Sequence, residues 1–351
     1  MPGWRPSCLR SSTDDDDDRT SKSGSQSGHD GKSGQPHQGV PEELRSYTIV
    51  ELEKRPGVGF GLTVSGGVDK DGRPRATNMR TGGVAQRSDL LQMGDLITAV
   101  SGIKTAKLKH EDVINLLKNA GDRVSLEIEY EIPPAVQDNG VTVTSKNVEI
   151  RLAKEDGSYG FTIRGGVNPN PLKTRPLTIT HIRSGGPADR DGTLKVGDRI
   201  LSVDGINLSN LTHMEALNTI KQSSMDATFR VDYDVSIMEA VRNATGPLLI
   251  EVAKTPGASL GVTLSSVSKG SKSVIVIDGV KPASIADRCG ALNVGDEILS
   301  IDSAKTSHMS VPEAMQLLAT SLDQIKLEIL PVSHMTPMLT YPTGQNRNQQ
   351  G

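Results

Sequence analysis

Short runs in which apolar and polar residues alternate recur along this chain, and they fall into three similar sets. Alternation with a period of two predicts β-strands with one buried face. Each set opens with one such run, at residues 47–52, 148–152 and 248–252. Each set closes with another, at residues 124–128, 227–231 and 325–329. Before each closing run the sequence predicts an amphipathic helix, at residues 110–119, 213–222 and 311–320.

A seven-residue element with Gly-Asp at its centre also occurs three times, roughly 100 residues apart. Its copies are Leu91–Ile97, Leu194–Ile200 and Leu292–Ile298. The spacing is too long for a solenoid unit, so each copy belongs to a domain with its own core. We expect domains at 46–131, 147–234 and 247–331, a disordered N-terminal segment at 1–45 and a flexible tail at 332–351.

Strands dominate each unit, and two helices accompany them, a short one containing alanine and the longer amphipathic one. This pattern predicts a mainly β fold, with each unit a small, partly open β-barrel whose ends are closed by helices. The linker at 131–146 is short and contains Pro133 and Pro134. The linker at 235–246 has Val235, Ile237, Met238 and Val241 at helical spacing, which leaves a short packed helix and a free tether as alternatives.

Composition excludes several classes of function. The chain has 39 basic and 42 acidic side chains, and aromatic residues are only 3%. Nucleic-acid binding calls for clustered positive charge or stacking aromatic residues, so we expect no nucleic acid partner. The two cysteines, Cys8 and Cys289, exclude a disulfide framework and favour a reducing, cytoplasmic setting. No apolar run reaches the ~18 residues of a membrane span, and no secretory signal core is present.

Catalytic constellations are not repeated in the three units. No Cys-His or Ser-His-Asp set recurs, and no His pair has metal-ligand spacing. Asp95, Asp198 and Asp296 do recur, but they lie in a turn where Asp normally accepts hydrogen bonds from backbone amides. We therefore expect no enzyme activity, no catalytic residue, no metal and no cofactor.

A loop with a central glycine follows each opening strand. Its copies are Gly59-Phe60-Gly61-Leu62, Ser158-Tyr159-Gly160-Phe161 and Ser259-Leu260-Gly261-Val262. With these loops, the Gly-Asp elements and the helices in one order, each unit resembles a PDZ domain. The resemblance implies that consecutive amides of the loop bind the terminal carboxylate of a peptide. We expect Lys54, Lys154 and Lys254 to assist the carboxylate directly or through water.

The loop sequence has two other interpretations. The glycine-rich run Gly57–Gly61 could be misread as a dinucleotide fingerprint, but that motif opens a helix, whereas the strand Leu62–Ser65 follows here. An ordinary hairpin turn explains any single loop. Three copies in register with Gly-Asp and the helix favour the carboxylate loop.

The PDZ resemblance also implies a groove between the second strand and the long helix, where a peptide adds as one more strand. The first helix residue would set selectivity: His110 and His213 suit Ser or Thr two residues before the ligand's terminus, and Val311 suits an apolar residue. The further groove positions are Ile114, Leu117, Leu217, Ile220, Met315 and Leu318. Core packing, or a surface histidine at a helix start, is the alternative explanation for these residues.

Three segments resemble the glutamate receptor-interacting protein family of scaffolds more specifically: 61–72, 185–190 and 251–261. That family carries seven PDZ domains, is cytoplasmic and assembles or traffics glutamate receptors at synapses and on vesicles. This chain stops after the third domain, and the family's receptor-tail binding is attributed to later ones. The start, with Trp4 near Cys8, resembles an S-palmitoylated isoform, the alternative being a free thiol.

The leading hypothesis is a non-enzymatic scaffold that binds C-terminal tails of receptors, transporters and signalling proteins. It would reach membranes through these partners or through acylated Cys8, and a PDZ domain would allow homo-oligomers. The runner-up is a structural adaptor whose domains pack on each other or dimerise, with one or more grooves silent. The third is a regulatory fragment of an enzyme whose catalytic part is missing.

Overall fold

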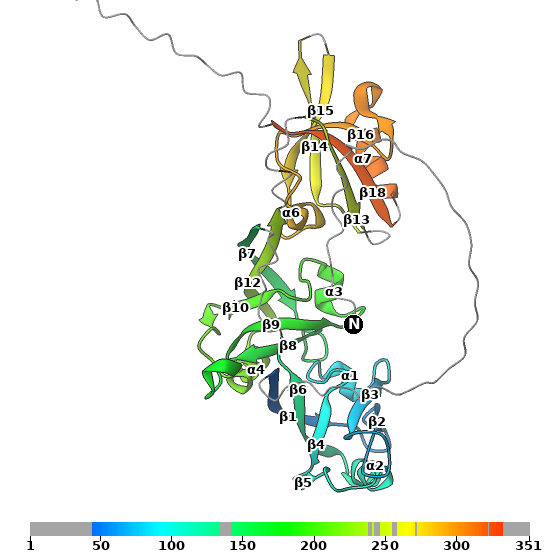
Figure 1. Ribbon diagram of the computed structural model, residues 1–351, viewed down its shortest axis with the longest axis vertical. Coiled ribbons are helices and arrows are strands. Elements are labelled where there is room, and N and C mark those ends of the chain that lie inside the picture. The colour runs from blue at the N-terminus through cyan, green and yellow to red at the C-terminus, as the bar shows by residue number, and fades with distance from the viewer. Residues whose placement is uncertain are drawn as a thin grey trace, which may run out of the picture. The chain divides into compact units, whose positions relative to one another are not determined.

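The computed structural model describes residues 44–133, 142–237, 241, 246–254, 258–270, 272–321 and 323–332. The first and second domains lie in one compact unit and the third domain in another (Figure 1). The expectations for residues 1–43, including Cys8, and for the tail from 333 onward lie outside the described residues.

The first domain is a six-stranded antiparallel sheet with a short and a longer helix. Its elements are β1 (Arg45–Glu53), β2 (Leu62–Ser65), β3 (Arg75–Met79), α1 (Val84–Arg87), β4 (Leu96–Val100), β5 (Ile103–Lys104), α2 (His110–Asn119) and β6 (Arg123–Glu131). The strand order is β1-β6-β4-β3-β2, with β5 paired to β4.

The other two domains repeat this order of strands and helices. The second comprises β7 (Thr142–Ala153), β8 (Phe161–Gly166), η2 (Pro171–Lys173), β9 (Arg175–Ile182), α3 (Pro187–Asp191), β10 (Arg199–Val203), β11 (Ile206–Asn207), α4 (His213–Gln222) and β12 (Asp226–Ile237). The third comprises β13 (Leu248–Ala253), β14 (Val262–Lys269), β15 (Lys272–Val280), α6 (Ile285–Cys289), β16 (Glu297–Ile301), β17 (Ala304–Lys305), η3 (Thr306–His308), α7 (Val311–Thr320) and β18 (Gln324–Leu330).

Each sheet is open rather than closed into a full barrel. The strands at its two ends are β1 and β2 in the first domain, β7 and β8 in the second, and β13 and β14 in the third. A strand at the end of a sheet keeps one row of backbone amides and carbonyls free to pair with another chain. The mainly β, partly open fold is therefore confirmed, and it leaves β2, β8 and β14 available as docking edges.

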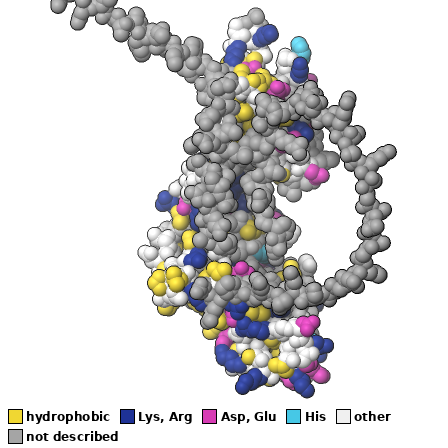
Figure 2. All heavy atoms as spheres, viewed as in Figure 1, with side chains coloured by type: hydrophobic (Ala, Val, Ile, Leu, Met, Phe, Trp, Pro, Cys, Tyr) yellow, Lys and Arg dark blue, Asp and Glu magenta, His cyan; other side chains and the backbone are white. Residues whose placement is uncertain are grey.

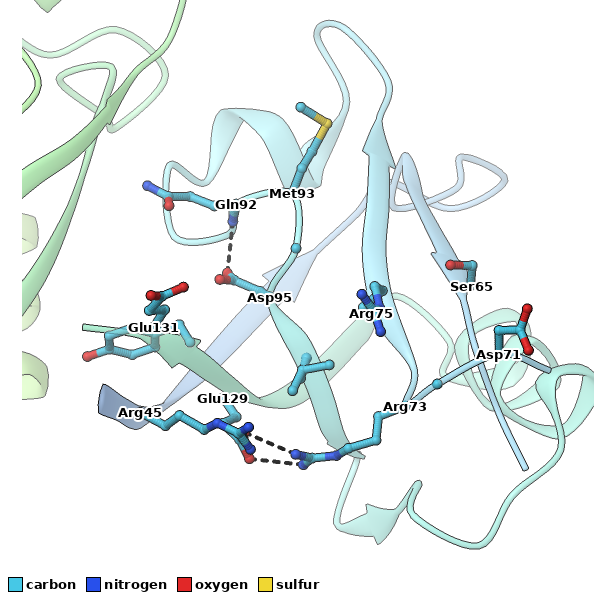
Figure 3. A pocket seen from close by; sticks show the side chains of 14 residues that line it. Arg45, Ser65, Asp71, Arg73, Arg75, Gln92, Met93, Asp95, Glu129 and Glu131 are labelled. Carbon is cyan, nitrogen blue, oxygen red and sulfur yellow. Dashed lines mark hydrogen bonds and ion pairs between the residues drawn. The ribbon is translucent and has the colours of Figure 1, made fainter. Parts of the chain in front are cut away.

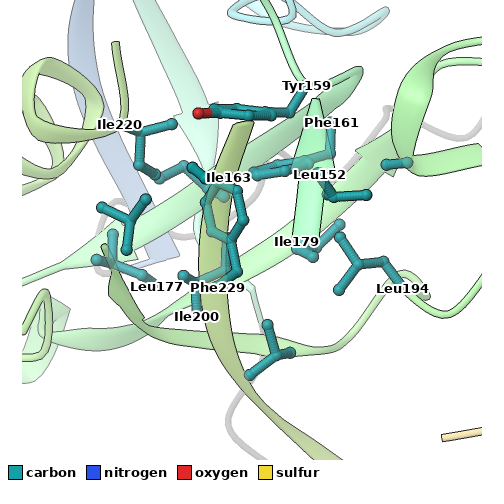
Figure 4. Close-up of a cluster of buried hydrophobic side chains, with 14 of the residues drawn as sticks. Leu152, Tyr159, Phe161, Ile163, Leu177, Ile179, Leu194, Ile200, Ile220 and Phe229 are labelled. Atoms are coloured by element: carbon teal, nitrogen blue, oxygen red, sulfur yellow. The ribbon is translucent and has the colours of Figure 1, made fainter. Parts of the chain in front are cut away.

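The core of the second domain shows how the alternating pattern is used (Figure 4). Phe229 is fully buried, and its ring meets Tyr159 edge-on at 4.8 Å between centroids and Phe161 at 5.6 Å. Tyr159 and Phe161 belong to the predicted carboxylate loop, so this loop is anchored by packing. Removing a buried phenylalanine side chain typically costs about 3–5 kcal/mol, so the loop's position depends on the core.

The three Gly-Asp elements are turns, as expected. Oδ2 of Asp95 accepts a hydrogen bond from the amide of Gln92 at 2.9 Å. Asp198 and Asp296 accept equivalent bonds from Lys195 and Asn293, both at 2.8 Å. The glycine before each Asp has a positive φ between 94° and 102°, which side chains rarely adopt.

The helix predicted as one alternative for the second linker is wrong at residues 235–237, which form a strand. Val235 and Ile237 extend strand β12, and Val235 is buried. Continued strand pairing outweighs a four-residue apolar pattern that is too short to define a period. Val241 is the one described residue from this predicted helix that packs against the core of the third domain, while Met238 lies outside the described residues.

Candidate functional site: carboxylate loops and grooves

The first carboxylate loop turns its carbonyls inward and its amides outward. The carbonyl of Phe60 accepts from the amide of Ala85 at 2.9 Å, and that of Gly61 accepts from Arg80 at 2.8 Å. Within the described residues, the amides of Phe60 and Gly61 donate to no protein acceptor. Adjacent free amides of this kind form a concave anion site, which is the chemistry that a peptide carboxylate requires.

The second and third loops are built in the same way. The carbonyls of Tyr159 and Gly160 accept from Ala188 and Arg183 at 3.0 and 2.8 Å, and those of Leu260 and Gly261 accept from Ala286 and Lys281 at 2.9 and 2.7 Å. They differ from the first loop by a serine. Ser158 and Ser259 each accept a hydrogen bond from the amide of the central glycine, at 3.0 and 3.1 Å. A carboxylate would have to share or replace these bonds.

The central glycine of each loop is required by space and by backbone conformation. Gly61, Gly160 and Gly261 have φ values of +73°, +82° and +86°. A Cβ atom at these positions would lie 3.1 Å from Gly83 Cα, 3.0 Å from Pro187 Cδ and 2.2 Å from Ser284 Cβ. Each loop therefore packs tightly against the start of its short helix, which holds the amides in place.

In the first domain, all four predicted loop residues and two of the three predicted groove residues line one cavity of about 390 Å³, and His110 lies outside it. Gly59, Phe60, Gly61 and Leu62 come from the loop side, and Ile114 and Leu117 come from α2. Lys118, which the sequence analysis did not single out, also lines it. The cavity joins the outward-facing amides to an apolar wall, an arrangement suited to a carboxylate and the side chain beside it.

His110 lies at the start of α2, partly buried beside the end of β2. Its Nδ1 is 3.2 Å from the carbonyl oxygen of Gly66. Its backbone amide donates a hydrogen bond to Oδ1 of Asp69 at 2.6 Å. The hydrogen bond from the His110 amide lowers the pKa of Asp69. One ring nitrogen, Nε2, has no partner among the described residues, so it is available to a ligand hydroxyl.

His213 has the same position in the second domain but a different environment. It is buried, its Nε2 is 3.0 Å from the carbonyl oxygen of Ile163, and its Nδ1 is 3.3 Å from Thr48 Oγ1. Burial, and secondly the charge of Arg164, lower the pKa of His213 to about 4. Both ring nitrogens thus have partners within the protein. Because of the lowered pKa, the ring is neutral near pH 7.

The first domain contributes to the surroundings of the second groove. A cavity of about 550 Å³ is lined by the predicted residues Tyr159, Phe161, Leu217 and Ile220. Ile49, Glu51 and the segment 87–90 of the first domain line the same space. Ser158, a predicted loop residue, donates a hydrogen bond to Asp89 of the first domain. A peptide in this groove would have to fit between the two domains.

A buried charged cluster at this contact was missed by the sequence reasoning. Arg164 of β8 is 1% exposed and donates to Asp95 of the first domain at 2.6 Å. Its guanidinium lies 4.1 Å from the centroid of Tyr130, whose ring is 5.5 Å from that of His213. The signal available in the sequence was an arginine directly after Phe161–Ile163, the one charged residue of its strand.

The third groove has the predicted residues on α7, but they differ in burial. Leu318 is 4% exposed and belongs to the core, whereas Met315 is 36% exposed. Val311 begins the helix and is partly buried. Core packing is thus the local role of Leu318, and Val311 and Met315 remain open to a ligand.

The lysine upstream of each loop does not point a free ammonium group at the carboxylate site in the second and third domains. Lys254 Nζ donates to the carbonyls of Leu318, Ala319 and Ser321 at 2.7, 3.0 and 3.2 Å. Lys154 Nζ donates to Lys221 and Ser223 at 3.0 and 2.6 Å. These carbonyls lie at the C-terminal ends of α7 and α4, where a cation is favourable.

Lys54 is arranged differently. Its Nζ is 3.6 Å from Asp122 and 5.3 Å from the centre of the Phe60 ring. It also lines the first cavity. Of the three lysines, this one is therefore placed to act on a bound carboxylate through space.

A larger cavity, of about 910 Å³, lies beside β3, β4 and β6 of the first domain, away from the carboxylate loop (Figure 3). Three of its charged side chains pair with one another, since Arg45 and Arg73 both donate to Glu129 at 3.0 Å. Although burial alone would raise it, the pKa of Glu129 is lowered by its bonds to Arg73. Glu129 is thus held by two arginines, and none of the predicted loop or groove residues lines this cavity.

The described part of the chain offers neither a membrane-spanning helix nor a metal site. No helix there is long and apolar enough to cross a membrane. No cluster of three or more His, Cys, Asp or Glu residues there is arranged to hold a metal ion.

Comparison with known proteins agrees with this geometry. The family model of the PDZ domain matches residues 50–129, 149–231 and 249–330. Glutamate receptor-interacting protein 2 of Xenopus laevis is 56% identical over 297 residues, which cover 85% of this chain and 27% of that protein. Glutamate receptor-interacting protein 1 of Rattus norvegicus is 54% identical over 92% of this chain and 29% of its own length. The chain thus spans less than a third of these relatives.

Proposed function

We propose a function from the premise that this chain belongs to the PDZ domain family and is a PDZ protein of the glutamate receptor-interacting group. The chain is a non-enzymatic scaffold that binds the C-terminal tails of membrane and signalling proteins. The observation that carries this proposal is the first-domain cavity, where free amides of Phe60 and Gly61 adjoin an apolar wall. By analogy with the relatives' names, glutamate receptor complexes are among its partners.

The first groove is proposed to select Ser or Thr two residues before the ligand's terminus. His110 has one ring nitrogen without a partner, and a neutral imidazole forms one such hydrogen bond with a hydroxyl. The third groove is proposed to select an apolar residue there, because Val311 offers no hydrogen bond. Val311→His should shift that preference toward Ser or Thr by about 1 kcal/mol.

The direct test compares a peptide ending in Thr-Ala-Val with its C-terminal amide, using the whole chain. We expect micromolar binding of the acid and at least about a tenfold loss for the amide, because the amide removes the charge that the loop binds. His110→Ala should weaken the acid and abolish the preference for Thr over Val. Equal binding of acid and amide would contradict the carboxylate assignment.

A second candidate function is supported for the middle domain. Because His213 bonds to Ile163 and Thr48, and first-domain residues line the groove, this domain suits a structural role with a silent groove. Gly160→Ala should then leave peptide binding by the whole chain unchanged. A loss of binding for a defined set of tails would instead assign that set to the second groove.

Membrane attachment through Cys8 remains a proposal, since this residue lies outside the described structure. One acyl chain gives reversible attachment, and a groove-bound tail on the same chain would strengthen it through effective concentration. Cys8→Ser should shift the protein from membranes to cytosol without changing peptide affinity. Unchanged fractionation would leave the grooves as the only membrane contact.

A further inference from the structure

The strands that border the three grooves end differently. In the first two domains a glycine pair, Gly66-Gly67 and Gly165-Gly166, stands at the end of the strand. In the third domain the corresponding residues are Ser266 and Val267. The strand β14 has 8 residues, against 4 in β2 and 6 in β8.

The glycine pair lets the chain turn under the start of the groove helix. A Cβ at Gly67 would lie 2.4 Å from the amide nitrogen of His110, and one at Gly166 would lie 2.6 Å from that of His213. The next residue then bonds to the segment before the helix: Val68 donates to Leu108 at 3.0 Å, and Val167 to Leu211 at 2.9 Å. The far end of each of these grooves is therefore closed by backbone.

No glycine pair makes this turn in the third domain, and β14 continues straight into a hairpin. Ser266 is paired with Ile275, Val267 with Val274 and Lys269 with Lys272. Because β14 is the last strand in its sheet, its other edge stays unpaired over this added length. A backbone edge of this kind accepts a further strand.

We propose that the third groove is open at its far end and reads a longer C-terminal tail than the first. The occupant is an extended tail of a partner protein, so the inference rests on the proposed function. With the carboxylate at the loop, the terminal residue lies opposite Val262, and an antiparallel strand then matches one ligand residue to each strand residue. Ser266–Lys269 would pair with ligand residues roughly four to seven before the terminus.

The side chains along this added edge define what the tail should carry. Ser266 is paired with Ile275, a core residue that is 3% exposed, so the side chain of Ser266 is on the same face as the core. Because side chains alternate along a strand, Val267 and Lys269 lie on the opposite, outer face. Val267 is 44% exposed. An apolar ligand residue would lie opposite it, about five before the terminus.

Positive charge lies at the end of the same hairpin, where basic side chains are visible in the space-filling view (Figure 2). Lys269 Nζ forms an ion pair with Glu297 Oε2 at 2.7 Å. Lys272 is exposed and has no ion pair among the described residues. An acidic ligand residue about seven before the terminus would lie beside Lys269, with Lys272 one strand further on. The partner is thus a tail with an acidic residue upstream of its apolar end.

The test uses the whole chain and fluorescent peptides of four, eight and ten residues that end in Val-Ala-Val. The longer ones carry leucine five and glutamate seven residues before the terminus. We expect the eight-residue peptide to bind about tenfold more tightly than the four-residue one, and the last two residues to add little. A benzophenone in place of the leucine should crosslink to the segment around Val267. Binding of all lengths with equal affinity would overturn the open groove while leaving the proposed function intact.

Failure of every peptide to bind would instead remove the proposed function of this groove, and the inference with it. The double variant Ser266→Gly, Val267→Gly should lose the gain from length and keep the affinity of the four-residue peptide. Lys272→Glu should weaken the glutamate peptide by about two- to fivefold and favour a lysine at that position. Lys305→Glu, an exposed control on β17 of the same domain, should change neither. An unchanged preference in Lys272→Glu would refute the role given to the hairpin's charge.

Discussion

Lys254 is a buried cation whose partners are backbone carbonyls rather than an acidic side chain. It is 3% exposed, and three carbonyl oxygens at the end of α7 accept its hydrogen bonds. Charge-assisted bonds of this kind are each stronger than bonds between neutral groups. These bonds tie the residue just after β13 to the C-terminal end of α7, the helix that carries the predicted groove residues, so we expect Lys254 to support the position of that helix.

Lys254→Met should therefore lower the stability of the third domain by roughly 1.5–3 kcal/mol, because the last carbonyls of α7 lose a charged donor. It should weaken acid and amide forms of a peptide by the same factor. Lys326→Met, which removes a half-exposed ion pair with Glu251, is the control and should have little effect. A selective loss of the acid form would place Lys254 at the carboxylate after all.

His213 gives the molecule a defined pH dependence. Arg164 and Tyr130 are the titratable groups that face it, with Thr48 and the carbonyl of Ile163. Its pKa is lowered to about 4 in the folded state from 6.5, so the unfolded chain binds more protons between these values. The stability that the neutral ring contributes is fully present above pH 6.5 and is lost as the pH falls toward 4.

The expected loss between pH 7 and pH 4.5 is about 2–3 kcal/mol, measured by urea unfolding at each pH. His213→Gln should be less stable at pH 7 but should show a smaller loss on acidification. Burial raises the pKa of Asp95, which acts in the opposite direction but is present in both proteins, so their difference isolates His213. Equal acid sensitivity in the two proteins would show that His213 is not buried and neutral.

At the scale of elements, each carboxylate loop depends on close packing between its glycine and the short helix that follows β3, β9 or β15. The long helices have the bounds that the sequence predicted, residues 110–119, 213–222 and 311–320, because their apolar spacing covers nearly three turns. The strand lengths at the grooves were not predicted, since they depend on where the chain turns away from the sheet.

Gly61→Ala should reduce first-groove peptide binding by at least about tenfold. The added Cβ would press on Gly83 and move the amides of Phe60 and Gly61. Gly102→Ala is the matched control, because Gly102 also has a positive φ of +81° but no atom within 4 Å of the added Cβ. Equal peptide binding by the two variants would show that a Cβ at position 61 does not displace the loop amides.

At the scale of the whole molecule, we expect the contact between the first and second domains to make them unfold as one unit. The pair of Arg164 and Asp95 is nearly inaccessible to water, with side-chain exposures of 2% and 6%. A buried ion pair need not stabilise relative to apolar residues, but removing one partner leaves the other charge buried and unpaired. The first domain, with its short linker, should therefore be marginal alone and stabilised by the second.

Arg164→Met or Asp95→Asn should each destabilise both domains by about 3–5 kcal/mol, and the double variant by less than the sum. Arg87 and Asp156 form a matched exposed pair between the same domains, at 2.8 Å and with exposures of 52% and 61%. Arg87→Met should cost at most about 1 kcal/mol. Independent melting of the first domain, unaffected by Arg164→Met, would mean that the two domains are not coupled.

The sequence alone determined the three repeated units, their alternating strands, their long helices and the three glycine loops. These features depend on neighbouring residues: periodicity within ten positions and a backbone conformation that only glycine adopts easily. Tertiary structure decided how equivalent residues diverge. His110 keeps a free ring nitrogen, whereas His213 bonds to Thr48, 165 positions away, and Arg164 pairs with Asp95, 69 positions away. No local pattern encodes partners at such separations, because they meet only when two finished domains pack together.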